Sequence, residues 1–213
     1  MIQIAPSMLA ADFLHLEKDV ELVNEYADIF HLDIMDGTFV PNISFGFPVV
    51  EAIAKKASRP LDAHLMIVHP EKYVERFAKA GAEYLSFHLN AVDNPGQVLA
   101  QIRAAGLKPG IAINPDIPVD SLYPYLGQCD YVVLMSVFAG FGGQKFIEAT
   151  YDRLVQLKAE IVRQGANCLI QVDGGVSADN ASRLAALGAD ILVAGSAVFK
   201  ADDPAAVIAA MKA

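Results

Sequence analysis

Two histidines and two aspartates near the predicted ends of strands are the residues of this chain best suited to chemistry. His31 and Asp33 are two positions apart, so both side chains point to one face if this segment is a strand. His64 lies near the end of the next predicted strand, and Asp173 ends a later one. Two imidazoles and two carboxylates suit zinc, iron, manganese or cobalt and leave room for a substrate. The sequence therefore predicts one divalent metal ion, held by His31, Asp33, His64 and Asp173.

Two other interpretations of these residues remain open at this point. A histidine taken alone is more often a hydrogen-bonded core residue than a metal ligand. All four residues could also form a buried charge network that only fixes the fold. Buried charges are costly and are usually retained for function, so their coincidence favours the metal site.

Asp33 and Asp173 have a predicted second role, as the catalytic residues. They come from well-separated strands, so they could approach one substrate carbon from opposite sides. One would remove a proton beside a ketone, and the other would return a proton to the opposite face. The cation would stabilise the enediolate oxygens as negative charge develops. This arrangement is typical of epimerisation, which needs no redox cofactor.

Glycine-rich loops after the late strands predict a phosphorylated substrate. F-G-G-Q at positions 141–144, Gly174 with Gly175, and Gly195 with Ser196 would expose backbone N–H groups where barrels often bind phosphate. Any one of these pairs alone is weak evidence and is more often a plain turn. Gly140, Gly142 and Gly143 also make this loop a candidate lid, with a long connection as the alternative.

Three methionines lie near predicted strand ends and are expected to contact the substrate. Met35, Met66 and Met135 could line the mouth of a barrel and keep the reacting centre dry. Packing in the core is an equally good explanation of their positions.

The elements that must position these residues alternate between strands and helices. Short runs rich in Ile, Val and Leu predict eight strands, at 3–7, 29–35, 61–66, 84–88, 108–113, 131–135, 169–173 and 191–194. Helical periodicity lies between them, for example at 13–25, 70–80, 95–105, 150–163 and 178–187. Gly81, Gly106, Gly165 and Gly188 follow four of these helices and mark one repeated unit.

Repeated strand–helix units predict a single (β/α)₈ TIM-barrel domain spanning 1–213. No linker, low-complexity stretch or change of composition divides the chain. The alternative is an open doubly wound sheet, which usually carries G-x-G-x-x-G after the first strand. Here M-L-A-A-D-F follows that strand, without a glycine, so the barrel is favoured.

Composition narrows the classes of partner. The net charge of −9 and the lack of a basic block argue against nucleic acid and against an anionic membrane. Cys129 and Cys168 are far apart in the sequence and form no C-x-x-C motif, a pattern compatible with a reducing compartment. No apolar run reaches the roughly 18 residues of a membrane helix, and M-I-Q-I-A-P-S-M-L shows no basic region followed by a long apolar stretch. We therefore expect a cytoplasmic protein.

Ordered motifs across nearly the whole chain resemble the ribulose-phosphate 3-epimerase family. They are I-A-P-S-M-L-A-A-D-F from Ile4, H-L-D-I-M-D-G-T-F-V-P-N from His31, D-A-H-L-M from Asp62, G-F-G-G-Q from Gly140 and V-D-G-G-V from Val172. The resemblance implies a (β/α)₈ enzyme of the pentose phosphate pathway that interconverts D-ribulose 5-phosphate and D-xylulose 5-phosphate and commonly forms homo-oligomers.

The resemblance also implies roles for individual residues. The metal would be held by His31, Asp33, His64 and Asp173, with Asp33 and Asp173 as proton acceptor and donor. Ser7 and His64 would contact the substrate. Phosphate would be bound by Gly142, Gly143, Gly175, Gly195 and Ser196, with Gly174 beside them.

Two segments depart from the family pattern. Phe138 and Ala139 stand where the family typically has Asn-Pro, and H-L-N-A-V-D-N after the fourth strand is also atypical. These changes bear on the lid and on the range of substrates. D-allulose 6-phosphate 3-epimerase is therefore an alternative with the same chemistry, and a non-catalytic sugar-phosphate-binding barrel is a further one.

Overall fold

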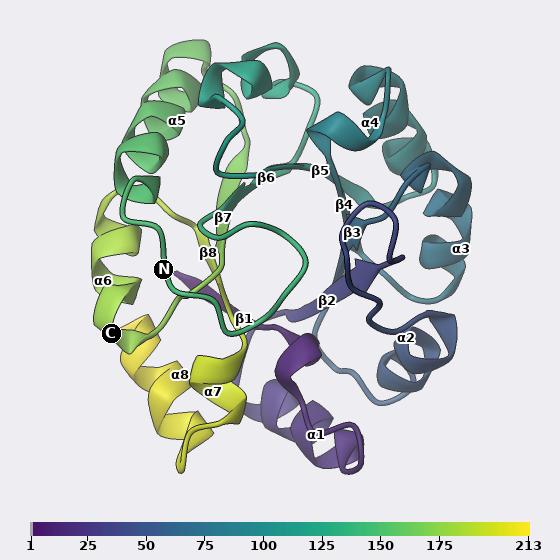
Figure 1. Ribbon diagram of the computed structural model, residues 1–213, viewed down its shortest axis with the longest axis vertical. Helices are drawn as coiled ribbons and strands as arrows, with labels where there is room; N and C mark the ends of the chain where they lie inside the picture. The colour runs from purple at the N-terminus through teal and green to yellow at the C-terminus, as the bar shows by residue number, and fades with distance from the viewer. Residues whose placement is uncertain (1) are drawn as a thin grey trace.

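The computed structural model describes residues 2–213 as a barrel of eight parallel strands surrounded by helices (Figure 1). Neighbouring strands pair in the order β1-β8-β7-β6-β5-β4-β3-β2, and every pair is parallel. A single parallel bridge between Ser7 and His31 joins β1 to β2 and brings the two edges together. The fold is therefore the predicted (β/α)₈ TIM barrel rather than an open doubly wound sheet.

The strands agree closely with those expected from the sequence. They are β1 Gln3–Pro6, β2 Phe30–Met35, β3 Leu61–Met66, β4 Tyr84–His88, β5 Lys108–Ile113, β6 Tyr131–Met135, β7 Leu169–Asp173 and β8 Ile191–Ala194. Only two bounds differ, because Ser7 and Ile29 lie just outside β1 and β2.

The helices differ from the prediction mainly where they begin. The α-helices are α1 Leu16–Tyr26, α2 Phe47–Ala54, α3 Val74–Lys79, α4 Pro95–Ala104, α5 Thr150–Gln164, α6 Ala178–Ala186, α7 Ser196–Phe199 and α8 Pro204–Lys212, and the 3₁₀ segments are η1 Met8–Ala10, η2 Pro70–Tyr73, η3 Leu89–Ala91 and η4 Val119–Tyr125. The predicted start of α1 at position 13 was too early. The Asp12 carboxylate accepts a hydrogen bond from the Leu14 N–H and holds this segment in a turn. The segment 70–80 is split between η2 and α3.

Local signals in the sequence explain where several helices start and stop. The Asn94 side chain accepts from the Gln97 N–H and caps α4, with Pro95 in its first turn. Ser177 and Asn180 form a reciprocal capping box at the start of α6. Gly165 ends α5 with a φ of 63°, a left-handed conformation that favours glycine.

Successive side chains of a strand point alternately towards the helices, where they form an apolar layer, and into the barrel, whose interior is polar. Phe30, Leu32 and Ile34 of β2 belong to the main apolar core between the strands and the helices. His31 and Asp33, on the opposite face of β2, are buried inside the barrel. The inward positions of other strands also carry buried polar residues, namely Asp62, His64, Ser86, His88 and Gln171. Such a polar interior is costly unless its groups are paired or used.

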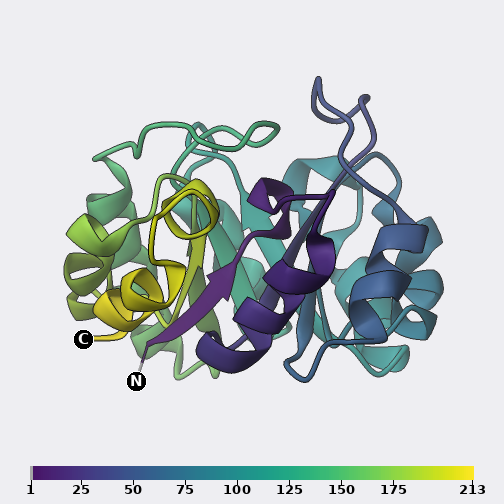
Figure 2. The same cartoon turned by 90° about the horizontal axis from the view of Figure 1, so that it is seen from below.

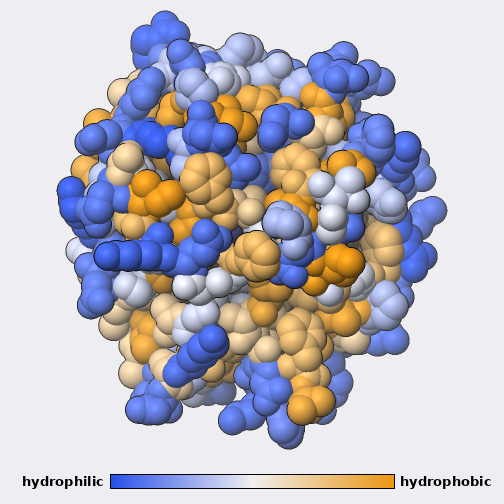
Figure 3. Space-filling model, viewed as in Figure 1, coloured by the Kyte–Doolittle hydropathy of each residue, from blue (hydrophilic) through white to orange (hydrophobic). Residues whose placement is uncertain are grey.

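The carboxyl ends of the strands open on one face of the molecule. Figure 2 shows the loops after β2 and β6 rising above this end, while the ends of the chain lie at the opposite side. In the space-filling view, apolar and neutral surface gathers over the centre of this face, inside a hydrophilic rim (Figure 3). Within residues 2–213, no helix has both the length and the apolar character needed to cross a membrane.

Candidate active site

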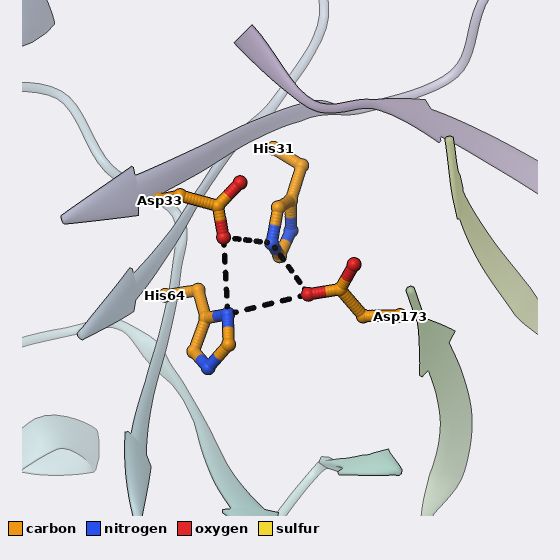
Figure 4. Close-up of side chains that lie close together, drawn as sticks. All are labelled: His31, Asp33, His64 and Asp173. Carbon is orange, nitrogen blue, oxygen red and sulfur yellow. Dashed lines mark ion pairs between the residues drawn. The ribbon is translucent and has the colours of Figure 1, made fainter. Parts of the chain in front are cut away.

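The four residues predicted to bind a metal converge at the carboxyl end of the barrel (Figure 4). His31 Nε2 lies 3.3 Å from Asp33 Oδ1 and 3.7 Å from Asp173 Oδ2. His64 Nδ1 lies 3.4 Å and 3.6 Å from the same two oxygens. Residues from β2, β3 and β7 therefore present two nitrogens and two oxygens to one point, as the sequence predicted.

The geometry of this four-donor cluster (His31, Asp33, His64 and Asp173) fits a divalent cation. Neither His31 Nε2 nor His64 Nδ1 has a hydrogen-bond partner among residues 2–213, although both atoms are buried. Unpaired buried polar atoms are uncommon because they lose their bonds to water. Ligand atoms about 2 Å from a tetrahedral ion lie roughly 3.3 Å from one another, and the four histidine–aspartate distances of the cluster are 3.3 to 3.7 Å. The residues present can thus hold a metal ion.

A second carboxylate fixes the ring of His31. Its Nδ1 lies 2.8 Å from Asp62 Oδ2, so Nδ1–H donates to this carboxylate and Nε2 faces the cluster. Asp62 also accepts from the Tyr131 hydroxyl at 2.7 Å and from the Gln171 amide at 2.8 Å. All of these side chains are buried inside the barrel. The network holds one tautomer of His31, with its lone pair directed at the cluster.

The charges of the cluster shift each other's pKa. Burial alone would lower the pKa of His31, but Asp33 and Asp62 outweigh it and raise that pKa well above its usual value. For Asp33, burial would raise the pKa, but His31 and His64 lower it instead. Burial also opposes the rise in the pKa of His64, which Asp173 and Asp33 produce. A cation that binds the cluster must therefore compete with protons for the ring nitrogens of His31 and His64.

Each aspartate has a second oxygen outside the cluster. The Ser7 hydroxyl donates to Asp33 Oδ2 at 2.5 Å, which leaves Asp33 Oδ1 as the oxygen nearest the histidines. Figure 4 shows the second oxygen of Asp173 pointing away from the other donors. One oxygen of each carboxylate can thus bind a cation while the other contacts a substrate.

A pocket of about 590 Å³ opens above the cluster. Asp33 and Asp173 reach it, and so do the predicted substrate contacts Ser7, Met35, Met66, Met135, Gly142, Gly143, Gly174, Gly175, Gly195 and Ser196. His64 was also predicted to contact the substrate, but its ring is fully buried below and does not line the pocket. The methionines supply apolar walls beside the two aspartates.

Two of the pocket glycines, Gly175 and Gly195, lie close to neighbouring segments of the chain. Gly175 has a φ of 62°, and a Cβ there would lie 2.5 Å from the backbone nitrogen of Phe146. A Cβ at Gly195 would lie 3.3 Å from that of Ala10. The loop after β7 therefore approaches the loop after β6 closely, and the start of α7 approaches η1, with Gly175 and Gly195 both at the pocket surface.

The loop between β6 and α5 crosses the mouth of the barrel (Figure 1). The Ala139 N–H donates to Asn114 Oδ1 at 3.0 Å, and Asn42 Nδ2 donates to the Gly140 carbonyl at 2.8 Å. Phe138 and Phe141 both line the pocket while remaining about half exposed. The segment that departs from the family pattern thus forms part of the pocket wall.

Three residues of the site were missed by the sequence analysis. Asp62 lies two positions before His64 on β3, so strand alternation could have placed both side chains inside the barrel. His88 ends β4, and its Nε2 lies 3.0 Å from His64 Nε2. Lys200 lines the pocket after a short helix, and nothing in its local sequence indicated this position.

Two solved structures with the same fold are distant from this chain in sequence. A ligand-bound structure of KGPDC from Streptococcus mutans matches with a TM-score of 0.75 at 14% identity, covering 99% of this chain and 95% of that one. 3-Hexulose-6-phosphate synthase from Salmonella typhimurium matches with a TM-score of 0.71 at 19% identity, covering 99% and 96%. At such identities, the likeness shows the fold alone.

Sequence comparisons identify the family. Residues 3–199 match the model of the ribulose-phosphate 3 epimerase family. Ribulose-phosphate 3-epimerase of a Synechocystis strain is 45% identical over 99% of this chain and 93% of its own length. The enzyme of that name from Mycobacterium bovis is 43% identical over 98% of this chain and 91% of its own length. The one from Bacillus subtilis is 42% identical over 95% of this chain and 94% of its own length. The chain therefore belongs to the ribulose-phosphate 3-epimerase family and is an enzyme of the isomerase class.

Proposed function

We propose that this enzyme interconverts D-ribulose 5-phosphate and D-xylulose 5-phosphate by inverting C3, with a divalent cation bound to the four-donor cluster. The observation that carries the proposal is the convergence of His31, Asp33, His64 and Asp173 beneath a pocket that both aspartates reach. The names of the relatives support a pentulose phosphate as the substrate.

In this proposal, the two aspartates move the protons. One carboxylate removes the proton from C3, and the electron pair of that bond shifts towards the C2 ketone to give an enediolate. The other, protonated, aspartate delivers its proton to the opposite face of C3 and so inverts that centre. Asp33 on β2 and Asp173 on β7 lie on different sides of the cluster, which supports these opposed roles (Figure 4).

The cation would offset the negative charge that develops on the substrate oxygens, which is the most demanding part of this reaction. Zinc, iron, manganese and cobalt all accept the two nitrogen and two oxygen donors of His31, His64, Asp33 and Asp173. Ser7 fixes the carboxylate of Asp33 through its hydrogen bond to Oδ2. Met35, Met66 and Met135 exclude water from the reacting carbon.

The phosphate of the substrate would bind among the glycine-containing loops. Gly142, Gly143, Gly174, Gly175, Gly195 and Ser196 all line one pocket, which supports this assignment. Backbone N–H groups at loop and helix starts suit a phosphate dianion, because they donate hydrogen bonds without adding charge to an acidic protein. Such a site explains how a chain of net charge −9 could bind an anionic sugar.

Exchange of solvent deuterium into C3 of D-ribulose 5-phosphate, followed by proton NMR, tests the proposal. The wild-type enzyme should exchange this hydrogen and form D-xylulose 5-phosphate. Asp173→Asn should slow both by about 10²- to 10⁴-fold, because the amide cannot accept or deliver the proton. Ligand binding by the wild type without any exchange would refute the enzymatic proposal. A kcat/KM for D-allulose 6-phosphate equal to or above that for the pentulose would refute the substrate assignment.

A further inference from the structure

The imidazole of His88 contacts His64 of the four-donor cluster, and the proposed reaction gives it no task. His88 ends β4 and is fully buried. Its Nε2 lies 3.0 Å from Nε2 of His64, and the two rings stack with centroids 5.0 Å apart and planes inclined by 22°. This contact involves the ring nitrogen of His64 that faces away from Asp33 and Asp173.

The distance between these nitrogens restricts where the protons can be. Two imidazole nitrogens at 3.0 Å form a hydrogen bond only if one carries hydrogen and the other presents a lone pair. His64 Nδ1 must be unprotonated to bind a cation. A neutral imidazole then carries its hydrogen on Nε2, so His64 Nε2–H donates and His88 Nε2 accepts.

The surroundings of His88 are compatible with this role. Accepting at Nε2 requires a neutral ring whose hydrogen is on Nδ1. His88 Nδ1 is buried and has no hydrogen-bond partner among residues 2–213, so no second polar group holds the ring in the opposite tautomer. The ring of Phe39 packs against His88 with centroids 5.0 Å apart, which restrains its position.

We propose that His88 is a positioning residue for cation binding, which accepts the Nε2 hydrogen of His64 and thereby directs the Nδ1 lone pair into the cluster. This inference rests on the proposed function, because it assumes that the cluster holds a cation. The two histidines would then be oriented by different chemistry. Asp62 holds His31 with a carboxylate, whereas a neutral imidazole holds His64.

Cobalt binding by two length-matched variants tests the role of His88. Glutamine can place an amide oxygen near the position of the histidine Nε2, whereas methionine fills similar space without a comparable acceptor. His88→Met should weaken Co²⁺ binding, measured by competition with a chelator, by about 10- to 100-fold, and should alter the visible absorption of the bound ion. His88→Gln should stay within about threefold of the wild type. Thr150→Val is the control, because it also changes a buried polar side chain but lies on α5.

The outcomes separate this inference from the proposed function. Wild-type protein that binds no Co²⁺ would overturn both. Wild-type affinity in a folded His88→Met would overturn the inference alone, and so would equal losses in the glutamine and methionine variants, since these would reflect packing. Wild-type protein that binds Co²⁺ but exchanges no deuterium at C3 would overturn the proposed reaction. The Co²⁺ affinities of the two His88 variants would then still decide whether His88 positions His64.

A measurement on the wild type decides the question if His88→Met does not fold. Histidine ring ¹H–¹⁵N correlation spectra of the Zn²⁺-loaded protein report which nitrogen carries each hydrogen. The inference requires hydrogen on His64 Nε2 and on His88 Nδ1. Hydrogen on His64 Nδ1, or on His88 Nε2, would overturn it.

Discussion

The hydroxyl of Ser7 donates to Asp33 Oδ2 at 2.5 Å, across the point where β1 and β2 meet to close the barrel. Ser7 lies just after β1, and its bridge to His31 brings the hydroxyl beside the aspartate of the H-L-D segment. The closure of the barrel therefore fixes the carboxylate proposed to exchange a proton with C3. A hydrogen bond to a charged group is typically stronger than one between neutral groups.

Ser7→Ala should lower kcat by about 10-fold while leaving the fold and Co²⁺ binding intact. The hydrogen bond to a carboxylate contributes about 1.5 kcal/mol, and Asp33 Oδ1, the oxygen nearest the histidines, does not depend on it. Steady-state kinetics and chelator competition measure the two effects. Ser86→Ala is the matched control, because Ser86 is also buried in the barrel but its hydroxyl has no hydrogen-bond partner in the described chain. A kcat unchanged by Ser7→Ala would contradict the assignment.

Asp62→Asn should weaken Co²⁺ binding by about 10- to 100-fold, because the carboxylate holds His31 in the tautomer that binds a cation. The amide keeps the size of the side chain but removes its charge. Tyr131→Phe removes only one hydrogen bond to Asp62 and should have a smaller effect. Chelator competition on both variants checks that Asp62→Asn loses more Co²⁺ affinity than Tyr131→Phe. An affinity that Asp62→Asn leaves unchanged would show that the carboxylate does not position His31.

Lys200→Met should raise KM for the phosphorylated ketose by roughly fivefold and leave kcat nearly unchanged. Among the described residues that line the pocket, Lys200 is the one basic side chain, and the glycine-containing loops line the same pocket. An exposed charge contributes up to about 1 kcal/mol, and added salt should reduce the difference from the wild type. Lys145→Met is the control, since Lys145 belongs to the loop after β6 but does not line the pocket. Equal KM values for Lys200→Met and the wild type would refute this role.

The stabilisation that a cation gives should increase with pH. Burial lowers the pKa of His31, but Asp33 and Asp62 raise it well above its usual value in the metal-free protein. Its protonated form thus stabilises the metal-free fold fully below about pH 6.5, and this contribution is lost as the pH rises through the raised pKa. A cation must displace that proton.

Calorimetry with and without Mn²⁺ measures this effect. The gain in Tm should be larger at pH 8 than at pH 6, because fewer protons compete for His31 and His64 at the higher pH. Isothermal titration in buffers of different ionisation enthalpy should show protons released on binding. A gain in Tm that is the same at both pH values, or larger at pH 6, would contradict the competition.

The sequence by itself determined the repeated strand–helix unit and the residues at strand ends. Period-two alternation is a local property, so it placed His31 and Asp33 on one face of β2 without knowledge of any neighbour. Helix starts were harder to predict. The turn held by the Asp12 carboxylate delayed the start of α1 to Leu16, beyond the start of the apolar pattern, since a side-chain hydrogen bond competed with the helix.

Only the tertiary structure decided which groups orient the candidate ligands. The contacts of Asp62 with His31 and of His88 with His64 join residues of different strands. Both depend on the register between neighbouring strands, in which His31 lies opposite Asp62 and Asp33 opposite His64. Register and barrel closure arise from packing over the whole sheet, so no local pattern encodes them. The sequence specified which donor atoms were available, and the closed barrel determined which of them face one point.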